Sequence, residues 1–117
     1  MNRNEIFQYV KETYAVEPDY PWGKWPEHAV LRHKAAGKWF GLIMNVPQDK
    51  LGLAGSRMVD VLNVKCDPFL IGTLRNQEGY LPAYHMNKEH WITILLNGPV
   101  PEGEICDLID LSYDLTK

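Results

Sequence analysis

Cysteine is scarce in this sequence, and long apolar runs are absent. The two cysteines, Cys66 and Cys106, are far apart and show no CxxC spacing, so a reducing compartment is the simple inference. No segment approaches the ~20 apolar residues of a membrane span, and the longest candidate, Trp91 to Leu96, has the length of a strand. The N-terminus shows no apolar run of the signal-peptide type. We therefore expect a cytoplasmic chain with no membrane partner.

Signatures of common enzyme classes are absent as well. The sequence contains no GxSxG elbow, P-loop, HExxH motif or Rossmann fingerprint, and Cys106 with a distant histidine is not a usable catalytic dyad. His85 and His90, with His28 or His33, could contribute to a metal site. No cysteine or carboxylate pattern completes a zinc site there, so we favour chance co-occurrence. We expect a non-enzymatic protein with no catalytic residue, no cofactor and no metal.

Length and composition predict one globular domain, residues 1–117, built around one core. The chain has 117 residues, which is within the usual size range of a single domain. Apolar residues make up 45% of it, close to the ~45–50% of globular proteins, so disorder is not expected. Three Phe, six Tyr and four Trp supply bulky side chains for the core.

The net charge of -3 is unevenly distributed. Residues 24–99 carry nine basic and six acidic side chains, a net charge of +3, whereas residues 100–117 carry one Lys and five acidic side chains, a net charge of -4. A non-specific DNA binder is normally basic overall, because its affinity comes largely from phosphate neutralisation. Any nucleic-acid role of this chain must therefore depend on a local patch in the middle segment.

Hydrophobic periodicity and turn residues predict eight secondary-structure elements. Asp67 and Pro68 open a helix, because Asp is a good N-cap and Pro suits the first helical position. Gly37 closes a hairpin connection, where a positive φ is commonly needed. Helices are predicted at residues 3–14, from 68 onward and at 102–111, and strands at 29–34, 38–46, 58–65 and 91–96, with the penultimate strand starting within 84–90.

The order α-β-β-β-α-β-β-α predicts an α+β fold. Hairpins and short loops favour a five-stranded antiparallel sheet with helices packed against one face. Alternation of side chains along a strand gives residues 38–46 two predicted faces, one with Phe40, Leu42, Met44 and Val46, the other with Trp39, Gly41, Ile43 and Asn45.

Five short motifs make the sequence more specific. They are Pro21-Trp22-Gly23, Gly37-Lys38-Trp39-Phe40-Gly41, Val64-Lys65-Cys66-Asp67-Pro68, His85-Met86-Asn87-Lys88-Glu89-His90-Trp91 and Ser112-Tyr113. Together they resemble the MmcQ/YjbR family over nearly the whole chain, from about Tyr20 to Tyr113, and the HMNKxHW block is the most distinctive. Gly41 stands where the family more often has alanine, and Val64 where leucine is usual; both exchanges are conservative.

The resemblance carries implications for fold and function. The family's fold is similar to that of type III secretion chaperones and of the frataxin-like CyaY proteins, which implies a two-layer α/β sandwich. The family is commonly described as DNA-binding, with a double-wing arrangement of hairpins. One fold hosts many functions, so the site residues must carry the argument.

The HMNKxHW block contains four candidate nucleic-acid-binding residues, Asn87, Lys88, His90 and Trp91. Asn and Lys can bond phosphate oxygens, Asn can read adenine, and aromatic or imidazole rings can stack on bases. A purely structural interpretation is equally open: Asn87 closes a turn, and His90 and Trp91 anchor the following strand in the core.

Basic side chains of the middle segment could form a phosphate-binding surface if their strands are neighbours. The candidates are Lys34, Lys38 and Lys65, with Lys88 from the block above; Arg32 and Arg75 could add to them. Lys38, beside the hairpin turn, is the favoured phosphate contact. The alternative is a solvated sheet face with scattered charges.

Two functions remain open. The first is a DNA-binding module, which we favour. The second is a protein-interaction or chaperone-like adaptor that uses the open sheet face, where Trp25 and Trp39 could line a groove with Trp91 that suits a peptide or small ligand, while Trp22 serves the fold. In either case we expect a monomer or weak dimer.

Overall fold

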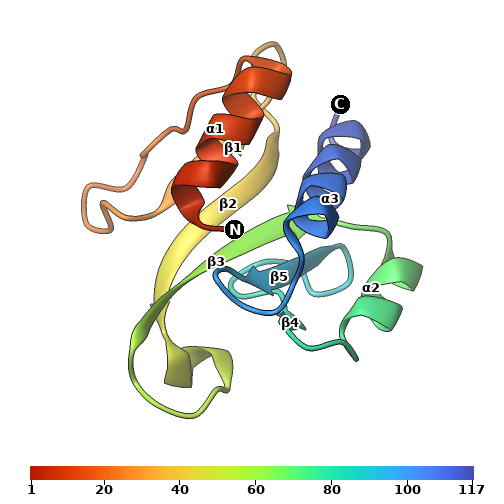
Figure 1. The fold of residues 1–117 in the computed structure, drawn as a ribbon. Coiled ribbons are helices and arrows are strands. Elements are labelled where there is room, and N and C mark those ends of the chain that lie inside the picture. Colours follow the sequence, from red (N-terminus) through yellow and green to blue (C-terminus); the bar gives the residue numbers. More distant parts are fainter.

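The computed structural model describes residues 1–117 and has three α-helices, one short 3-10 helix and five strands (Figure 1). In chain order these are α1 (Arg3–Tyr14), β1 (Ala29–Arg32), β2 (Trp39–Pro47), η1 (Gln48–Leu51), β3 (Met58–Lys65), α2 (Pro68–Leu74), β4 (Tyr80–Pro82), β5 (Trp91–Leu95) and α3 (Glu102–Leu115). The predicted α+β fold and its element order are confirmed.

Local capping explains why two helices begin where the sequence predicts. At α1, the Asn2 side chain accepts a hydrogen bond from the Glu5 amide at 2.9 Å, and the Glu5 carboxylate accepts one from the Asn2 amide at 2.8 Å. At α2, the Asp67 carboxylate accepts from the Phe69 amide at 2.8 Å, and Pro68 occupies the first helical position. Both caps satisfy amide groups that a helix leaves unpaired at its start.

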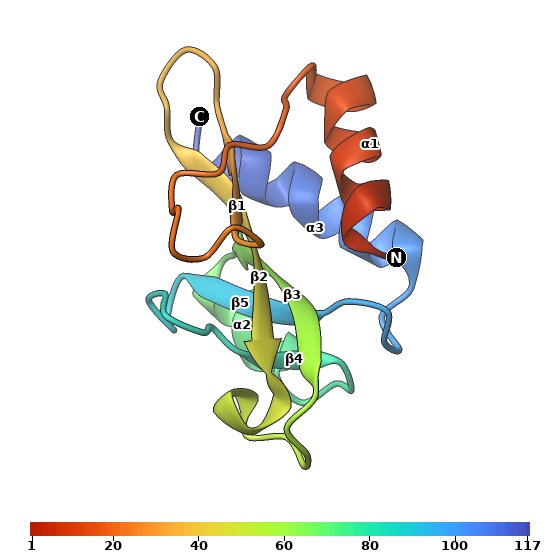
Figure 2. The same ribbon diagram turned by 90° about the vertical axis from the view of Figure 1, so that its left-hand side faces the viewer.

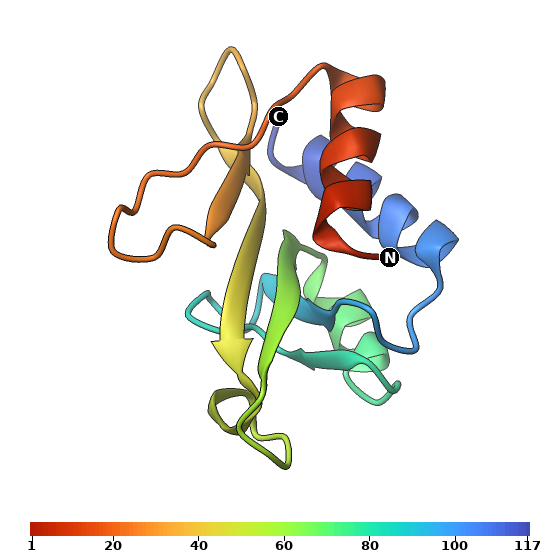
Figure 3. The same ribbon diagram turned by 60° about the vertical axis from the view of Figure 1, so that its left-hand side comes forward.

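The five strands form one antiparallel sheet in the order β1-β2-β3-β5-β4. All three helices contribute buried side chains to the same core cluster of 20 residues, so they lie on one face of the sheet, as predicted. Figure 3 shows α1 and α3 on one side of the strands and the loop that follows α1 on the other. We call the helix-covered side the helix face and the opposite side the second face.

A β-bulge changes the predicted facing of β2. Leu31 pairs with Gly41 and Arg32 pairs with Trp39, so Phe40 has no partner on β1. The predicted alternation is wrong at this point: Phe40 is buried on the helix face, while Trp39 joins Leu42 on the second face. Leu31 packs closely over Gly41, where a Cβ would lie 2.9 Å from Leu31 Cδ1 and would require the Leu31 side chain to shift.

The penultimate strand lies earlier than the sequence predicts. β4 covers Tyr80–Pro82 and pairs with β5, whereas residues 84–90 form no strand. The backbone of Tyr84 bonds to side chains instead of to a neighbouring strand: its amide donates to Thr93 Oγ1 at 2.9 Å, and its carbonyl accepts from Asn63 Nδ2 at 3.1 Å. The segment therefore crosses the second face rather than extending the sheet.

Asn63 and Thr93 form a fully buried polar pair between the central strands β3 and β5. The Thr93 hydroxyl donates to Asn63 Oδ1, and both side chains bond to Tyr84. No buried side-chain polar atom of the protein lacks a partner. Because buried polar groups must be paired, this pair fastens the segment that contains the HMNKxHW block to the sheet.

The second face carries a smaller apolar cluster. Its buried members are Val30, Leu42, Met44, Val46 and Val61. Loop and strand-end side chains pack against this cluster, among them Trp22, Trp39, Leu51, Tyr84 and Met86. The face that the sequence predicts to be open is therefore partly covered by the protein's own loops.

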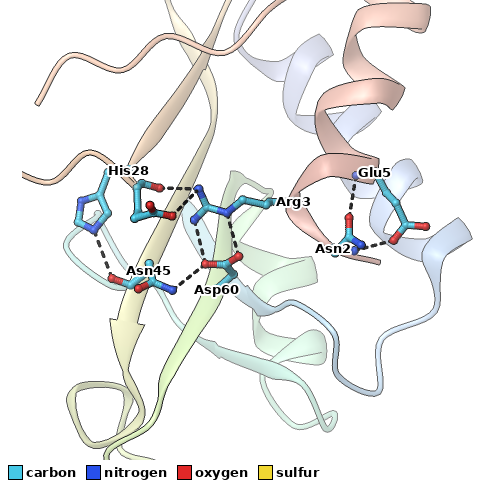
Figure 4. Close-up of polar contacts among 7 residues, drawn as sticks. Asn2, Arg3, Glu5, His28, Asn45 and Asp60 are labelled. Carbon is cyan, nitrogen blue, oxygen red and sulfur yellow. Dashed lines mark hydrogen bonds and ion pairs between the residues drawn. The ribbon is translucent and has the colours of Figure 1, made fainter.

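A polar network joins α1 to the middle of the sheet (Figure 4). The Arg3 guanidinium donates to both Asp60 carboxylate oxygens at 2.8 Å and to the Glu27 carbonyl at 2.7 Å, and Asn45 donates to Asp60 at 2.9 Å. Arg3 and Asp60 are only 16% and 20% exposed. Burial by itself would raise the pKa of Asp60, but the hydrogen bonds from Arg3 and Asn45 and the Arg3 charge bring it below 3.8.

The two long helices are joined through Asp110. Its carboxylate accepts hydrogen bonds from the Tyr9 hydroxyl at 2.7 Å and from the Tyr14 hydroxyl at 2.5 Å. Burial, together with the Asp110 carboxylate, raises the pKa of Tyr9 to about 12 and raises the pKa of Tyr14 further. Both phenols therefore stay neutral donors over the ordinary pH range, and Tyr14 stacks on Tyr113 of α3 with ring centroids 3.8 Å apart.

Replacing Arg3 should destabilise the fold. Arg3→Gln removes the cation from a largely buried carboxylate, and we expect the free energy of unfolding to fall by about 2 kcal/mol, measured by urea denaturation at pH 7. Lys50→Gln, in exposed η1, is the matched control and should change it by less than about 0.5 kcal/mol. Equal effects of the two variants would contradict the role of the Arg3–Asp60 pair.

Asp60 should also make stability pH-dependent. Because its folded-state pKa is depressed, its ionised form stabilises the fold fully above the unfolded-state pKa near 4, and this contribution is lost as the pH falls through the folded-state value. The difference in unfolding free energy between the wild type and Asp60→Asn should therefore shrink below about pH 4. Chemical denaturation at pH 7, 5, 4 and 3 measures this difference, and one that stays constant would contradict the assignment.

Removing the Asn63 side chain should release the segment that crosses the second face. Asn63→Leu leaves the Tyr84 carbonyl without its donor and should cost about 1–3 kcal/mol of stability. Hydrogen exchange of residues 83–90 should become faster than in the wild type. Asn76→Leu is the control, because Asn76 donates only to the Gly72 carbonyl on the exposed end of α2. Unchanged exchange in Asn63→Leu would show that the segment is held by other contacts.

Candidate functional site

The strand ends bring most of the predicted site residues to one end of the sheet. β1 ends at Arg32, β2 begins at Trp39, β3 ends at Lys65 and β5 begins at Trp91. Because neighbouring strands are antiparallel, these four termini lie at the same end. The hairpin turn with Lys34 and Lys38 and the β4–β5 connection with Lys88 extend from it. We call this region, with Arg32, Lys34, Lys38, Lys65 and Lys88, the lysine end.

One cation–indole contact and one strand pair of a lysine with a tryptophan lie on the second face at the lysine end. The Arg32 guanidinium lies 5.7 Å from the centroid of the Trp39 ring, and it also pairs with Asp19 at 2.8 Å. Lys65 and Trp91 are direct register partners on β3 and β5, so their side chains leave the same face. The structure thus brings Lys65 and Trp91, two of the predicted site residues, side by side. Trp39 has moved to this face because of the β-bulge.

Ser112 of α3 joins β2 and β3 where their direct pairing ends. The paired register of the two strands ends at Leu42 and Asn63. Beyond it, the buried Ser112 hydroxyl donates to the Phe40 carbonyl at 2.6 Å and accepts from the Lys65 amide at 2.9 Å. A helix side chain therefore replaces a direct bond between the two strands. The terminal Ser-Tyr motif signals this residue in the sequence, but its bridging role does not follow from the motif.

The hairpin that presents Lys34 and Lys38 is anchored at its base. The His33 amide donates to the Lys38 carbonyl at 2.8 Å, and Gly37 adopts the positive φ of 69° that its position in the turn requires. The His33 ring bonds to Thr116 Oγ1 at 2.7 Å, which ties the hairpin to the end of α3. In Figure 2 the hairpin and the C-terminus lie side by side. Both lysines are exposed to solvent.

The β4–β5 connection supports the structural interpretation of Asn87. Its side-chain oxygen accepts hydrogen bonds from the amides of Glu89 at 2.8 Å and His90 at 3.2 Å, which closes the turn before β5. Lys88 and His90 are exposed, and Trp91 is only partly buried. His90 therefore does not anchor the strand through its side chain; its carbonyl accepts instead from the Cys66 amide at 2.8 Å.

The four lysines of the lysine end have no acidic partner. Lys34, Lys38, Lys65 and Lys88 take part in none of the ion pairs of the protein, whereas Arg32 pairs with Asp19. Helix α3 carries five acidic side chains and no basic one, and it lies on the helix face. Arg75 lies after α2, on the path to the start of β4 at the opposite end of the sheet, so it does not join the lysines.

Other candidate chemistry is not concentrated at the lysine end. No group of three or more His, Cys, Asp or Glu side chains is placed to hold a metal ion. Burial raises the pKa of the Cys66 and Cys106 thiols, which disfavours a reactive thiolate. A hollow of about 410 Å³ lies along α1 and is lined mainly by polar side chains. None of the helices is both long and apolar enough to cross a bilayer.

Sequence reasoning missed two contributors to this site, Arg32 as a partner of Trp39 and Asn63 as an anchor. A usable signal existed for Asn63, because a polar residue interrupts the apolar run of β3. No short-range signal indicated that Trp39 and Arg32 would meet on the second face, since this depends on the bulge.

Comparisons with known proteins agree with these motifs. Residues 11–115 match the YjbR family. The uncharacterised Bacillus subtilis protein YyaQ is 55% identical over 117 residues, which is 100% of this chain and 99% of that protein.

Solved structures extend the comparison to the fold. A Pseudomonas syringae protein, solved by crystallography, has 49% identity, a TM-score of 0.98 and full coverage of both chains. A Deinococcus radiodurans protein, with 23% identity and a TM-score of 0.72 over 96% of this chain and 75% of its own, shares the fold. By its sequence match and its motifs, the chain belongs to the YjbR family.

Proposed function

We propose that this chain is a non-enzymatic DNA-binding protein that contacts phosphates through the lysine end. The observation that carries the proposal is the gathering of Lys34, Lys38, Lys65 and Lys88, none of which has an acidic partner, at one end of the sheet. Lysines without partners are free to replace the counterions of a phosphate backbone.

Residues that could contact phosphates lie on both sides of Lys65. Lys34 and Lys38 extend on the β1–β2 hairpin, Lys88 lies on the β4–β5 connection, and Lys65 leaves the sheet between them. Both flanking segments are tied to the body of the protein, one through His33 and the other through Asn63. Such anchoring reduces the conformational entropy lost when a backbone is bound.

The net charge of -3 is compatible with this proposal because the four lysines have no ion-pair partner and five of the acidic side chains lie on α3, in the helix layer. The lysines project from the strand ends and the second face. At physiological ionic strength, exposed charges separated by more than about 8 Å are largely screened from one another. Local potential at the lysine end therefore governs phosphate binding more than the total charge does.

A protein-interaction domain is the second candidate, and Phe69 is the observation that favours it. Its side chain is 88% exposed at the start of α2, away from the loops that cover the second face. Aromatic side chains are enriched in protein interfaces. Phe69→Ser separates the two candidates, because it should leave DNA binding unchanged if the lysine end is the site.

Charge reversal at the lysine end should weaken DNA binding. We expect Lys38→Glu and Lys88→Glu each to reduce affinity for labelled duplex or single-stranded DNA about tenfold or more at low salt, because each removes one phosphate contact and adds repulsion. Wild-type affinity should fall linearly with salt on a log–log plot, with a slope near -0.9 per phosphate contact on duplex DNA. Fluorescence anisotropy across a salt series measures both effects.

Lys50→Glu supplies the matched control, since Lys50 is exposed in η1 at the opposite end of β2 (Figure 3). It should retain wild-type affinity within about threefold, as expected for long-range charge effects screened by salt. Absence of binding by the wild type to both forms of DNA at low salt would refute the proposed function. Equal losses in Lys50→Glu and Lys38→Glu would refute the lysine end as its site.

A further inference from the structure

We infer that the lysine end prefers single-stranded DNA, with a base stacked on Trp91. This inference rests on the proposed DNA-binding function and adds the form of DNA that is recognised. It depends on where Trp91 lies relative to the lysines, and on the contacts that the four tryptophans make within the protein.

Trp91 lacks the ring partners that the other three tryptophans have. Trp22 meets Trp39 edge to face at 5.7 Å, and Trp25 stacks on His28 at 6.0 Å. Trp91 takes part in no aromatic or cation contact of this kind, and it packs against neither of the two apolar clusters. A partly buried indole without such partners has ring surface available to a ligand.

Lys65 lies beside Trp91 on the second face. The two residues are direct register partners on β3 and β5, and neighbouring strands are about 4.8 Å apart. Trp39, on β2, instead packs against Trp22 and carries the Arg32 guanidinium over its ring. Trp91 is therefore the indole at this end whose ring is available, and it has a lysine without an ion-pair partner next to it.

An indole beside a lysine suits a single strand better than a duplex. A single strand can direct a base onto an aromatic ring while its phosphates meet lysines, and such stacking tolerates any base. In a duplex the bases are paired and stacked inside, so an indole on a sheet face can reach only the backbone. Arg32 is already paired with Asp19, which leaves Lys65 as the cation beside the stacked base.

The chemistry also separates the roles of the side chains. Lys34, Lys38 and Lys88 would contact phosphates of either form of DNA, whereas Trp91 would contribute only to the single strand. A loss confined to single-stranded DNA is therefore the signature of stacking. A merely structural role for Trp91 would lower affinity for both forms together.

The test compares a labelled 20-nucleotide oligothymidine with a 20-base-pair duplex by fluorescence anisotropy at one salt concentration. The wild type should bind the single strand about tenfold or more tightly. Trp91→Leu should weaken single-strand binding about 5- to 140-fold, the equivalent of about 1–3 kcal/mol of stacking, and leave duplex binding within about twofold. Trp25→Leu, on the loop before β1, is the control and should bind like the wild type.

Trp91→Phe is the control for misfolding, because it keeps an aromatic ring at this position of β5. It should retain the wild-type melting temperature within a few degrees and an intermediate single-strand affinity. Binding of oligothymidine should quench the tryptophan emission of the wild type more than that of this variant.

The outcomes separate the two proposals. Binding to neither form of DNA overturns both. Duplex binding equal to or tighter than single-strand binding overturns this inference and leaves the proposed function standing. Single-strand preference that is unchanged in Trp91→Leu and Trp91→Phe overturns the stacking role.

Discussion

The packing of the helices onto one face of the central strands is the contact on which the rest of the structure depends. Ile43, Leu62 and Ile94, one from each of β2, β3 and β5, are completely buried beneath them. Burying a side chain of this kind contributes about 1.5–3 kcal/mol relative to exposure. Because the helices cover one face of the sheet, the loops that connect the strands must cross the second face or extend from the ends of the sheet.

Buried polar side chains convert this apolar framework into a specific one. Asp60 connects α1 to the sheet, Asn63 with Thr93 holds the β4–β5 connection, and Ser112 spans β2 and β3 where their pairing ends. Each of these groups would be costly to leave unpaired in the interior. Their partners are backbone or side-chain groups far away in the sequence, so they select one arrangement of loops among the many that the hydrophobic pattern allows.

The lysine end is a consequence of this arrangement rather than of any single motif. Antiparallel pairing places four strand termini at one end, and the bulge at Phe40 rotates Trp39 onto the same face as Lys65 and Trp91. Acidic α3 is retained on the other layer by its own apolar stripe. The four lysines at the strand ends thus lie apart from the five carboxylates of α3, although the net charge of the protein is negative.

The sequence by itself determined what short-range physics controls: the bounds of α1 and β3, the start of α2 at its Asp67 cap, the order of elements and the family motifs. Helix caps, turns and hydrophobic periodicity act within a few residues, so they can be recognised from the sequence. Only the tertiary structure decided the facing of Phe40, the position of β4 and the bridge through Ser112. These features depend on contacts between residues distant in sequence, and one unpaired residue in a strand reverses the facing of those beyond it.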